Sequence, residues 1–171
     1  MFTISVCMIV KDEELTLERV LKCASKFADE IIVVDTGSID HSIEIARKFT
    51  PFVYNFTWCN NFSKARNFSI DKASKDYFMW LDADDYIDDE NIEKIIELKK
   101  SQDNVDFYMF KYVIGHPNPT FEFFRERLIK NNSRHYFDGA VHEAITPKGN
   151  IKYLDIKIEH RKEKVIIQHE I

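Results

Sequence analysis

The chain has 171 residues, 44% of them hydrophobic, with 24 basic and 29 acidic side chains and a net charge of -5. This length suits one hydrophobic core, so we expect a single domain over residues 1–171. The acidic balance, without a sustained basic face, argues against a nucleic-acid partner. The longest apolar run, residues 4–10, is far shorter than the ~20 residues that cross a bilayer.

The first half of the chain alternates strand and helix patterns. Residues 3–10 and 30–35 are nearly continuous apolar runs, typical of interior parallel strands, and a helical stripe of apolar residues follows each. Asp40 is placed to cap the second helix. Residues 52–56 predict a third strand and residues 63–73 a helix. Successive strand–helix units predict an α/β fold with a doubly wound, mainly parallel central sheet and a ligand crevice at the strands' carboxyl ends.

The most informative stretch covers residues 76–85, DYFMWLDADD. It begins as an aromatic-rich buried strand and ends in three carboxylates within four positions, those of Asp82, Asp84 and Asp85. These acids would repel one another unless a cation lies among them, and a hard divalent ion that also binds phosphate oxygens is the usual solution. The alternative is that they cap the next helix, but Asp88 and Asp89 are better placed to do so. The stretch therefore predicts a metal-diphosphate site.

Arg66 lies near the start of its predicted helix, where a cation opposes the helix dipole. An anionic ligand and a salt bridge to a nearby acid explain this position equally well.

From Val105 onward the pattern changes to strands with short connections. A strand is expected over residues 106–113, a turn over 115–119, short strands or loops over 122–130 and 135–145, and one or two further strands over 151–158. We therefore divide the domain into residues 1–104, an α/β half, and residues 105–171, a smaller β-rich half that is complete or truncated. Residues 164–171 have the pattern of an element cut short.

The three cysteines, Cys7, Cys23 and Cys59, lie far apart without CxxC spacing, which favours neither zinc nor redox chemistry. We expect reduced thiols in a cytoplasmic protein, with peripheral association at a membrane left open. No basic segment precedes the first apolar run as in a signal peptide.

Several blocks of the sequence, in order, resemble those of family 2 glycosyltransferases with the GT-A fold. They are ISVCMIVKDEE (residues 4–14), IIVVDTGSID (31–40), WCNNFSKARN (58–67) and WLDADD (80–85). RLIKN (127–131) and YFDGAVHE (136–143) are similar to segments of a bacterial branch whose members often carry helical repeats downstream. The resemblance covers nearly the whole chain.

This resemblance implies a nucleotide-diphosphate sugar donor, usually uridine-linked, and a divalent cation, Mn or Mg. It also implies that residues 1–104 are the nucleotide-binding half and residues 105–171 the acceptor-side half. By analogy Asp35 would recognise the base, with the backbone near Val10 and with Glu13 beside it. Arg66 would lie by the nucleotide or its phosphates. Asp82 would approach the ribose or the metal's water shell, and Asp84 would coordinate the metal.

Family 2 enzymes typically invert the anomeric centre, so the resemblance also implies a carboxylate base for the acceptor hydroxyl. Glu143 is the first candidate because it follows a glycine-containing turn, and Asp138 is the second; an ordinary surface acid is the alternative for Glu143. His160 resembles a late metal-binding histidine of GT-A enzymes, although Arg161-Lys162 follow it where the related branch has a glycine and an aromatic residue. A solvated His160 is the alternative. His142 could supply the metal ligand, orient Glu143 or lie in the core beside Trp80.

Other function classes fit less well. The Asp35-Thr36-Gly37 tripeptide of aspartic proteases lies here between a strand and a helix, and the glycine-rich basic loop of sugar nucleotidyltransferases is missing after the first strand. A nucleotide-sugar-binding module, or a catalytically incomplete fragment of a larger glycosyltransferase, stays open as the alternative. The acceptor could be a saccharide, a lipid-linked sugar or a peptide.

Overall fold

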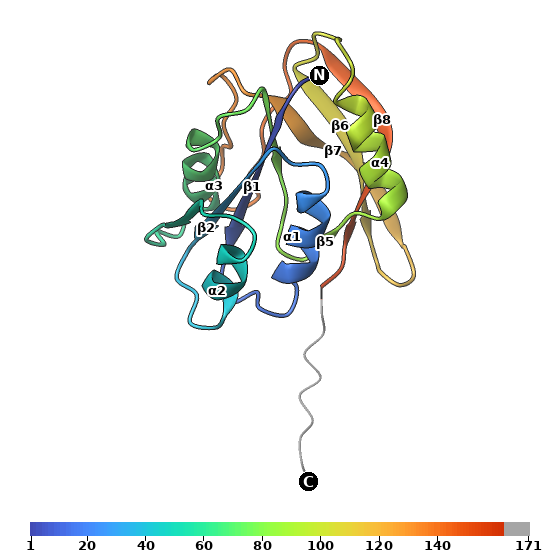
Figure 1. The fold of residues 1–171 in the computed structure, drawn as a ribbon. Coiled ribbons are helices and arrows are strands. Elements are labelled where there is room, and N and C mark those ends of the chain that lie inside the picture. The colour runs from blue at the N-terminus through green and yellow to red at the C-terminus, as the bar shows by residue number, and fades with distance from the viewer. Residues whose placement is uncertain (163–171) are drawn as a thin grey trace.

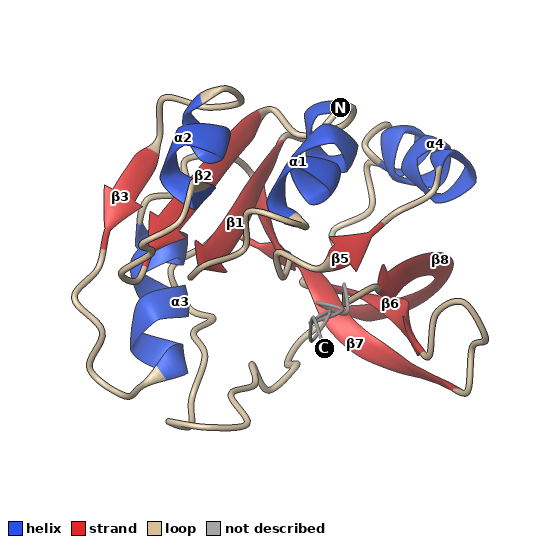
Figure 2. Ribbon diagram, turned by 90° about the horizontal axis from the view of Figure 1, so that it is seen from below, coloured by secondary structure: helices blue, strands red, loops and turns tan. Residues whose placement is uncertain are grey.

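The computed structural model describes residues 1–162, so the element expected over residues 164–171 lies outside the described part. Eight strands form one sheet in the order β3-β2-β1-β4-β7-β6-β8-β5 (Figures 1 and 2). The strands are β1 (Ile4–Val10), β2 (Glu30–Asp35), β3 (Val53–Asn55), β4 (Tyr77–Trp80), β5 (Asp85–Tyr86), β6 (Phe107–Ile114), β7 (Phe121–Lys130) and β8 (Ile151–His160). The helices are α1 (Leu17–Ser25), α2 (Ser42–Arg47), α3 (Phe62–Asp71) and α4 (Asp89–Leu98).

The first four strands of the sheet order are mutually parallel, as the apolar runs predict. β1 pairs with β2 on one side and with β4 on the other, and β3 joins the outer side of β2. The register places Val10 beside Asp35, the last residues of β1 and β2. The carboxyl ends of these strands therefore meet at one edge, where an open parallel sheet binds its ligands.

The β-rich second half continues the same sheet. β7 runs antiparallel to β4 and β6, β8 lies parallel to β6, and the two-residue strand β5 pairs antiparallel with β8. β8 is one long strand. Residues 135–145, for which short strands or loops were expected, form a loop with one isolated bridge between Asp138 and Ala144.

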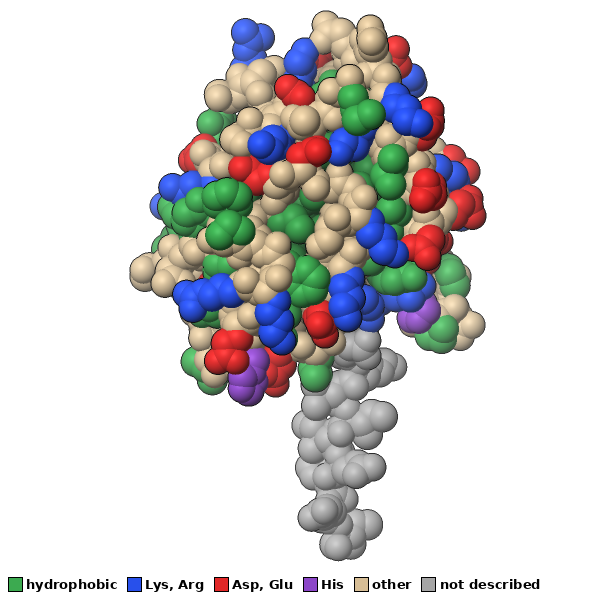
Figure 3. Space-filling view, viewed as in Figure 1, with side chains coloured by type: hydrophobic (Ala, Val, Ile, Leu, Met, Phe, Trp, Pro, Cys, Tyr) green, Lys and Arg blue, Asp and Glu red, His purple; other side chains and the backbone are tan. Residues whose placement is uncertain are grey.

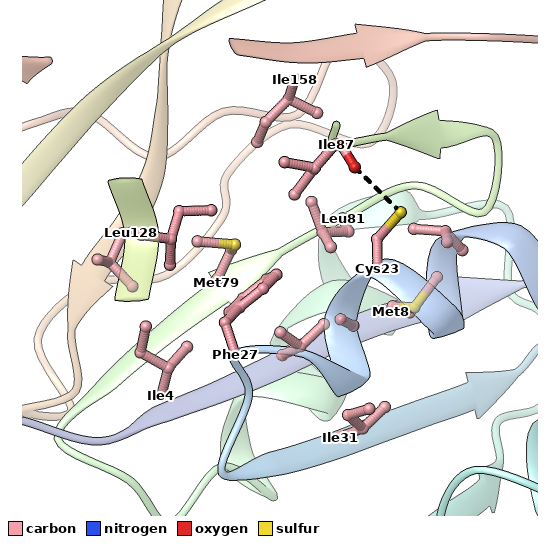
Figure 4. Packing of buried hydrophobic residues seen from close by; sticks show 14 of the residues in the cluster. Ile4, Met8, Cys23, Phe27, Ile31, Met79, Leu81, Ile87, Leu128 and Ile158 are labelled. Carbon is pink, nitrogen blue, oxygen red and sulfur yellow. Dashed lines mark hydrogen bonds between the residues drawn. The ribbon is translucent and has the colours of Figure 1, made fainter. Parts of the chain in front are cut away.

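Helices cover both faces of the parallel half, with α1 and α2 on one face and α3 on the other (Figure 2). The larger core lies under α1 and α4 and includes Met8, Phe27, Met79 and Leu128, all of them buried (Figure 4). Cys23 also points into this core, where its thiol contacts the carbonyl oxygen of Ile87 at 3.3 Å. Burial raises the pKa of the Cys23 thiol, so this cysteine is an inert packing residue.

Local signals place most helix starts. Asp88 caps α4 by accepting a hydrogen bond from the Asn91 N–H at 2.8 Å, as predicted. Asp40 accepts from the Ser42 N–H at 2.9 Å, although the residue at the N-cap position of α2 is His41. Asn61 caps α3, which starts at Phe62. Arg66 therefore lies beyond the first turn, and the dipole argument for an anionic partner was wrong.

The molecular surface in Figure 3 mixes basic and acidic side chains over the face that carries α1 and α2, without a field of one sign. Among residues 1–162, none of the helices has the length and apolar content that crossing a bilayer would require.

Candidate active site

A cavity of about 440 Å³ opens at the carboxyl ends of the parallel strands. Its lining comes from the ends of β1 and β2, from α3 and the loop before it, from the turn after β4, and from the end of β8. The lining residues are Ile9, Val10, Lys11, Glu13, Thr36, Trp58, Phe62, Arg66, Asp82, Ala83, Asp84 and His160. Segments up to 151 positions apart in the sequence thus line one cavity, at the edge where the strand pattern predicts a crevice.

The loops after β1 and β2 are joined by hydrogen bonds beside the cavity. Asp12 accepts from the Ile39 N–H at 2.8 Å, and the Glu13 N–H donates to Ser42 Oγ at 2.8 Å. Asp35 is buried, and its carboxylate accepts from the N–H groups of Gly37 and Ser38 at 3.0–3.2 Å. Asp35 itself is not among the lining residues; its neighbours Val10 and Thr36 are. Its assignment to base recognition stays a prediction.

Arg66, another lining residue, bridges two acids. Its Nη2 donates to Asp82 Oδ1 at 2.7 Å and its Nε donates to Glu143 Oε1 at 2.8 Å. The guanidinium also lies over the rings of Trp80, 4.9 Å from the centroid, and Phe137, 5.4 Å from the centroid. Burial opposes the charge on Arg66, but Asp82 and Glu143 outweigh it and raise the pKa of the guanidinium. The predicted salt bridge to a nearby acid is therefore present, and an anionic ligand for this arginine stays a prediction.

The loop that carries Glu143 is held by α3. Asn67 exchanges two hydrogen bonds with the backbone of Phe137, at 2.8 and 2.9 Å, and the Phe62 N–H donates to the Ala140 carbonyl at 3.1 Å. The Glu143 side chain is 16% exposed, so it is not an ordinary surface acid. The helix thus sets the position of both its own Arg66 and that arginine's partner.

The third acid of the cluster, Asp85, points away from the cavity into the protein. It is fully buried and accepts from Arg127 Nη1 at 2.9 Å, from the Asp82 N–H at 2.9 Å and from Tyr112 Oη at 3.0 Å. Arg127 is fully buried as well, between the rings of Trp80 and Tyr112, at 3.8 and 4.4 Å from their centroids. Burial raises the pKa of Asp85 to about 6 in spite of the arginine charge. Through the Asp82 N–H this pair contacts the turn that presents Asp82 and Asp84.

Asp84 and His160 form the part of the site that could hold a cation. The register of β5 and β8 pairs Asp85 with His160, and this pairing brings His160 Nδ1 to 3.4 Å from Asp84 Oδ1. Ligand atoms of Asp84, Asp85 and His160 lie within 4.8 Å of one another. Because the oxygens of Asp85 are already occupied, the donor set that fits a divalent ion is the Asp84 carboxylate with the His160 imidazole.

The charges on this side of the cavity favour a cation. Burial raises the pKa of Glu13, and the carboxylates of Asp84 and Asp82 raise it further. The pKa of Asp82 moves the other way, because Arg66 and Arg127 outweigh the effect of burial and lower it. Asp84 and Glu13 thus share a negative region that a divalent ion would neutralise.

Besides Asp35, the predicted residues Glu143, Asp138 and His142 are not among the residues that line the cavity. Asp138 accepts from the Gly139 N–H at 2.8 Å, is exposed, and is not among the residues that line the cavity, so its role as a base stays a prediction. His142 is exposed with a φ of 61°, so the expectation of a core histidine beside Trp80 was wrong. The ring that packs on Trp80 is that of Phe137, with the centroids 5.5 Å apart.

Sequence reasoning missed the parts of the site that depend on long-range pairing. Arg127 lies in the RLIKN segment but has no predicted role, and Tyr112 is one aromatic residue in an apolar strand. An arginine beside two apolar residues in a predicted strand is the signal that could have found Arg127, because a buried charge requires a partner. Trp58 and Phe62 at the cavity, with ring centroids 4.8 Å apart, carried no comparable signal.

Comparison with known proteins identifies the family. The sequence model described as "Glycosyl transferase family 2" matches residues 5–154. The chain belongs to glycosyltransferase family 2. Among relatives of this family 2 chain, the SPbeta prophage-derived glycosyltransferase SunS of Bacillus subtilis is 30% identical over 146 residues, which cover 82% of this chain and 34% of SunS. A TPR repeat-containing protein of Synechococcus elongatus is 36% identical over 110 residues, 64% of this chain and 27% of that protein.

Solved structures show that this family 2 chain has the GT-A fold. TarS 1-349 of S. aureus in complex with UDP-GlcNAc matches with a TM-score of 0.72 at 16% identity, over 99% of this chain and 62% of that one. Glucosyl-3-phosphoglycerate synthase of Mycobacterium tuberculosis, in complex with Mn2+ and UDP-glucose, matches with a TM-score of 0.65 at 15% identity, over 96% and 73%. The chain thus spans about a third or less of the two sequence relatives named above and somewhat more of these structures.

Proposed function

We propose that this domain transfers a sugar from a nucleotide-diphosphate donor, a UDP-sugar, to an acceptor hydroxyl, with inversion at the anomeric carbon and with Mn or Mg. The observation that carries the proposal is the meeting of Arg66, Asp82, Asp84 and His160 in one cavity at the carboxyl edge of the sheet. The UDP-sugar complexes of two proteins that share the fold support the choice of donor.

Asp84 and His160 would hold the metal. When bound, the ion stabilises the charge that accumulates on the leaving diphosphate. Arg66 contributes a second cation, and its buried side chain is paired with Asp82. A guanidinium so placed can donate hydrogen bonds to phosphate oxygens.

In the transfer step the acceptor oxygen attacks the anomeric carbon, the bond from that carbon to the diphosphate oxygen breaks, and the electron pair leaves with the nucleoside diphosphate. The acceptor's proton goes to a carboxylate, for which Glu143 is our first candidate and Asp138 our second. In the present arrangement Glu143 is paired with Arg66, and a guanidinium partner weakens a carboxylate base. Diphosphate binding at Arg66 would compete for the guanidinium and make Glu143 the stronger base.

A panel of UDP- and GDP-sugars, incubated with the domain and Mn²⁺, tests the proposal through release of free nucleotide. We expect release from at least one UDP-sugar, with loss of the activity on chelation of the metal. Tight donor binding without release would instead favour the alternative, a nucleotide-sugar-binding module that needs further chain to be active. If the domain shows neither donor binding nor nucleotide release, both functions are contradicted.

A further inference from the structure

A chain of three polar side chains connects the buried Asp85 with the cavity. Tyr112 Oη lies 3.0 Å from Asp85 Oδ1 and 3.0 Å from His160 Nδ1. The three residues come from β5, β6 and β8. Their spacing is fixed by the ladders of the sheet, which pair Asp85 with His160 and Tyr112 with Ile158.

When Asp85 is ionised, the hydrogen bonds that link Asp85, Tyr112 and His160 can run in only one direction. A carboxylate has no proton to offer, so the Tyr112 hydroxyl donates to Asp85. Asp85 Oδ2 accepts from the Asp82 N–H and from Arg127. These two hydrogen bonds hold the carboxylate with Oδ1 toward Tyr112. A phenol has a single proton, and once that proton is committed to Asp85 the oxygen can only accept from His160. Nδ1 of His160 must then carry a hydrogen.

A second acceptor supports the same assignment. Asp84 Oδ1 lies 3.4 Å from the same Nδ1 atom of His160. This contact is long for a hydrogen bond, so Tyr112 is the main partner, but both neighbours favour a proton on Nδ1. The other ring nitrogen, Nε2, then keeps its lone pair.

We propose that Tyr112 is a positioning residue that holds His160 as the Nδ1–H tautomer and thereby offers the unprotonated Nε2 to a divalent cation beside Asp84. The inference rests on the proposed function in so far as it needs a metal site, but the tautomer can be measured without metal. Histidine ligands commonly donate their second ring N–H to an oxygen in this way, and loss of that oxygen typically costs 10–100-fold in metal affinity. Asp85 accordingly positions His160 through Tyr112 and is not itself a metal ligand.

The first test is the tautomer in the metal-free protein. Long-range ¹H–¹⁵N spectra of the protein labelled at its 6 histidines distinguish protonated from unprotonated ring nitrogens, and His160→Ala assigns the signals of His160. At about pH 8, where imidazole is neutral, we expect the proton of His160 on Nδ1. A proton on Nε2 would overturn the proposal, because Tyr112 would then be the donor to His160.

The second test is the affinity for Mn²⁺, titrated calorimetrically in the presence of UDP. Tyr112→Phe removes one oxygen and keeps the ring over Arg127, so we expect the fold to persist, checked by the melting temperature, and Mn²⁺ affinity to fall about 10-fold. Tyr108→Phe is the matched control. Tyr108 is a buried tyrosine of the same strand, and its ring packs on Phe2 and Tyr77. Loss of its hydroxyl should leave the Mn²⁺ affinity unchanged.

The outcomes separate the two proposals. Equal Mn²⁺ affinity of the wild type and Tyr112→Phe would overturn the positioning role and leave the metal site intact. No Mn²⁺ binding by the wild type would instead overturn the proposed metal dependence, and the tautomer spectrum would still decide whether Tyr112 fixes His160.

Discussion

The buried pair of Arg127 and Asp85 gives the sharpest prediction about stability. Both side chains are 0% exposed, with 2.9 Å between Arg127 Nη1 and Asp85 Oδ2. Arg127→Met keeps the apolar stem between the rings of Trp80 and Tyr112 but leaves Asp85 with two neutral donors. Breaking a buried pair on one side costs roughly 3–5 kcal/mol, against a total free energy of unfolding of about 5–15 kcal/mol for a typical domain.

An exposed pair provides the matched control. Lys152 and Asp103 approach even more closely, with 2.6 Å between Nζ and Oδ2, but their side chains are 46% and 53% exposed. Because water screens this pair, Lys152→Met should cost less than about 1 kcal/mol. Distance alone would rank the two pairs the other way, so the comparison isolates burial.

Urea unfolding followed by far-ultraviolet circular dichroism measures both variants, with the free-energy differences taken at a common m-value. Adding Asp85→Asn to Arg127→Met removes the unpaired charge and keeps an acceptor for Tyr112, so the double variant should regain much of the loss. A cost for Arg127→Met no larger than that for Lys152→Met would refute the reasoning. It would mean that Asp85 becomes neutral without penalty.

Three further predictions concern the site. Asp84→Asn should lower Mn²⁺ affinity in the presence of UDP by ~10-fold or more, because it removes the charged oxygen ligand; an unchanged calorimetric affinity would refute this assignment. Glu143→Gln keeps an acceptor for Arg66, so it should bind UDP normally but lose transfer to the acceptor; normal turnover would move the base to Asp138. Burial raises the pKa of Asp85 from its ordinary value of 3.8 to about 6, so the native state takes up a proton first and stability should fall as the pH rises from 3.8 to about 6. The difference in urea midpoint between the wild type and Asp85→Asn should therefore fall across this range, and a constant difference would contradict the prediction.

The sequence predicted the position of the site because strand ends are local signals. Apolar runs without alternation mark β1, β2 and β4 as parallel interior strands, and parallel strands must end at one edge. Asp82 and Asp84 follow β4, so their place at that edge could be predicted from pattern alone. The bounds of β2 were predicted to the residue, since Glu30 and Asp35 flank an unbroken apolar run.

The partners of these acids could not be predicted, because they come from distant segments. Arg66 lies 16 positions from Asp82, and Arg127 lies 42 positions from Asp85. Only the order of strands in the sheet brings β7 against β4 and so places Arg127 under the turn. A composition that is nearly balanced in charge gives no preference for one pairing over another.

These pairings change the physical argument for a metal. Read from the sequence, three neighbouring carboxylates require a cation because they repel one another. In the folded chain Arg66 neutralises Asp82 and Arg127 neutralises Asp85, so the repulsion is already relieved on both sides of the turn. The case for a divalent ion therefore depends on Asp84, which faces the cavity beside Glu13 and an imidazole, and the two arginines serve to hold that one carboxylate in place.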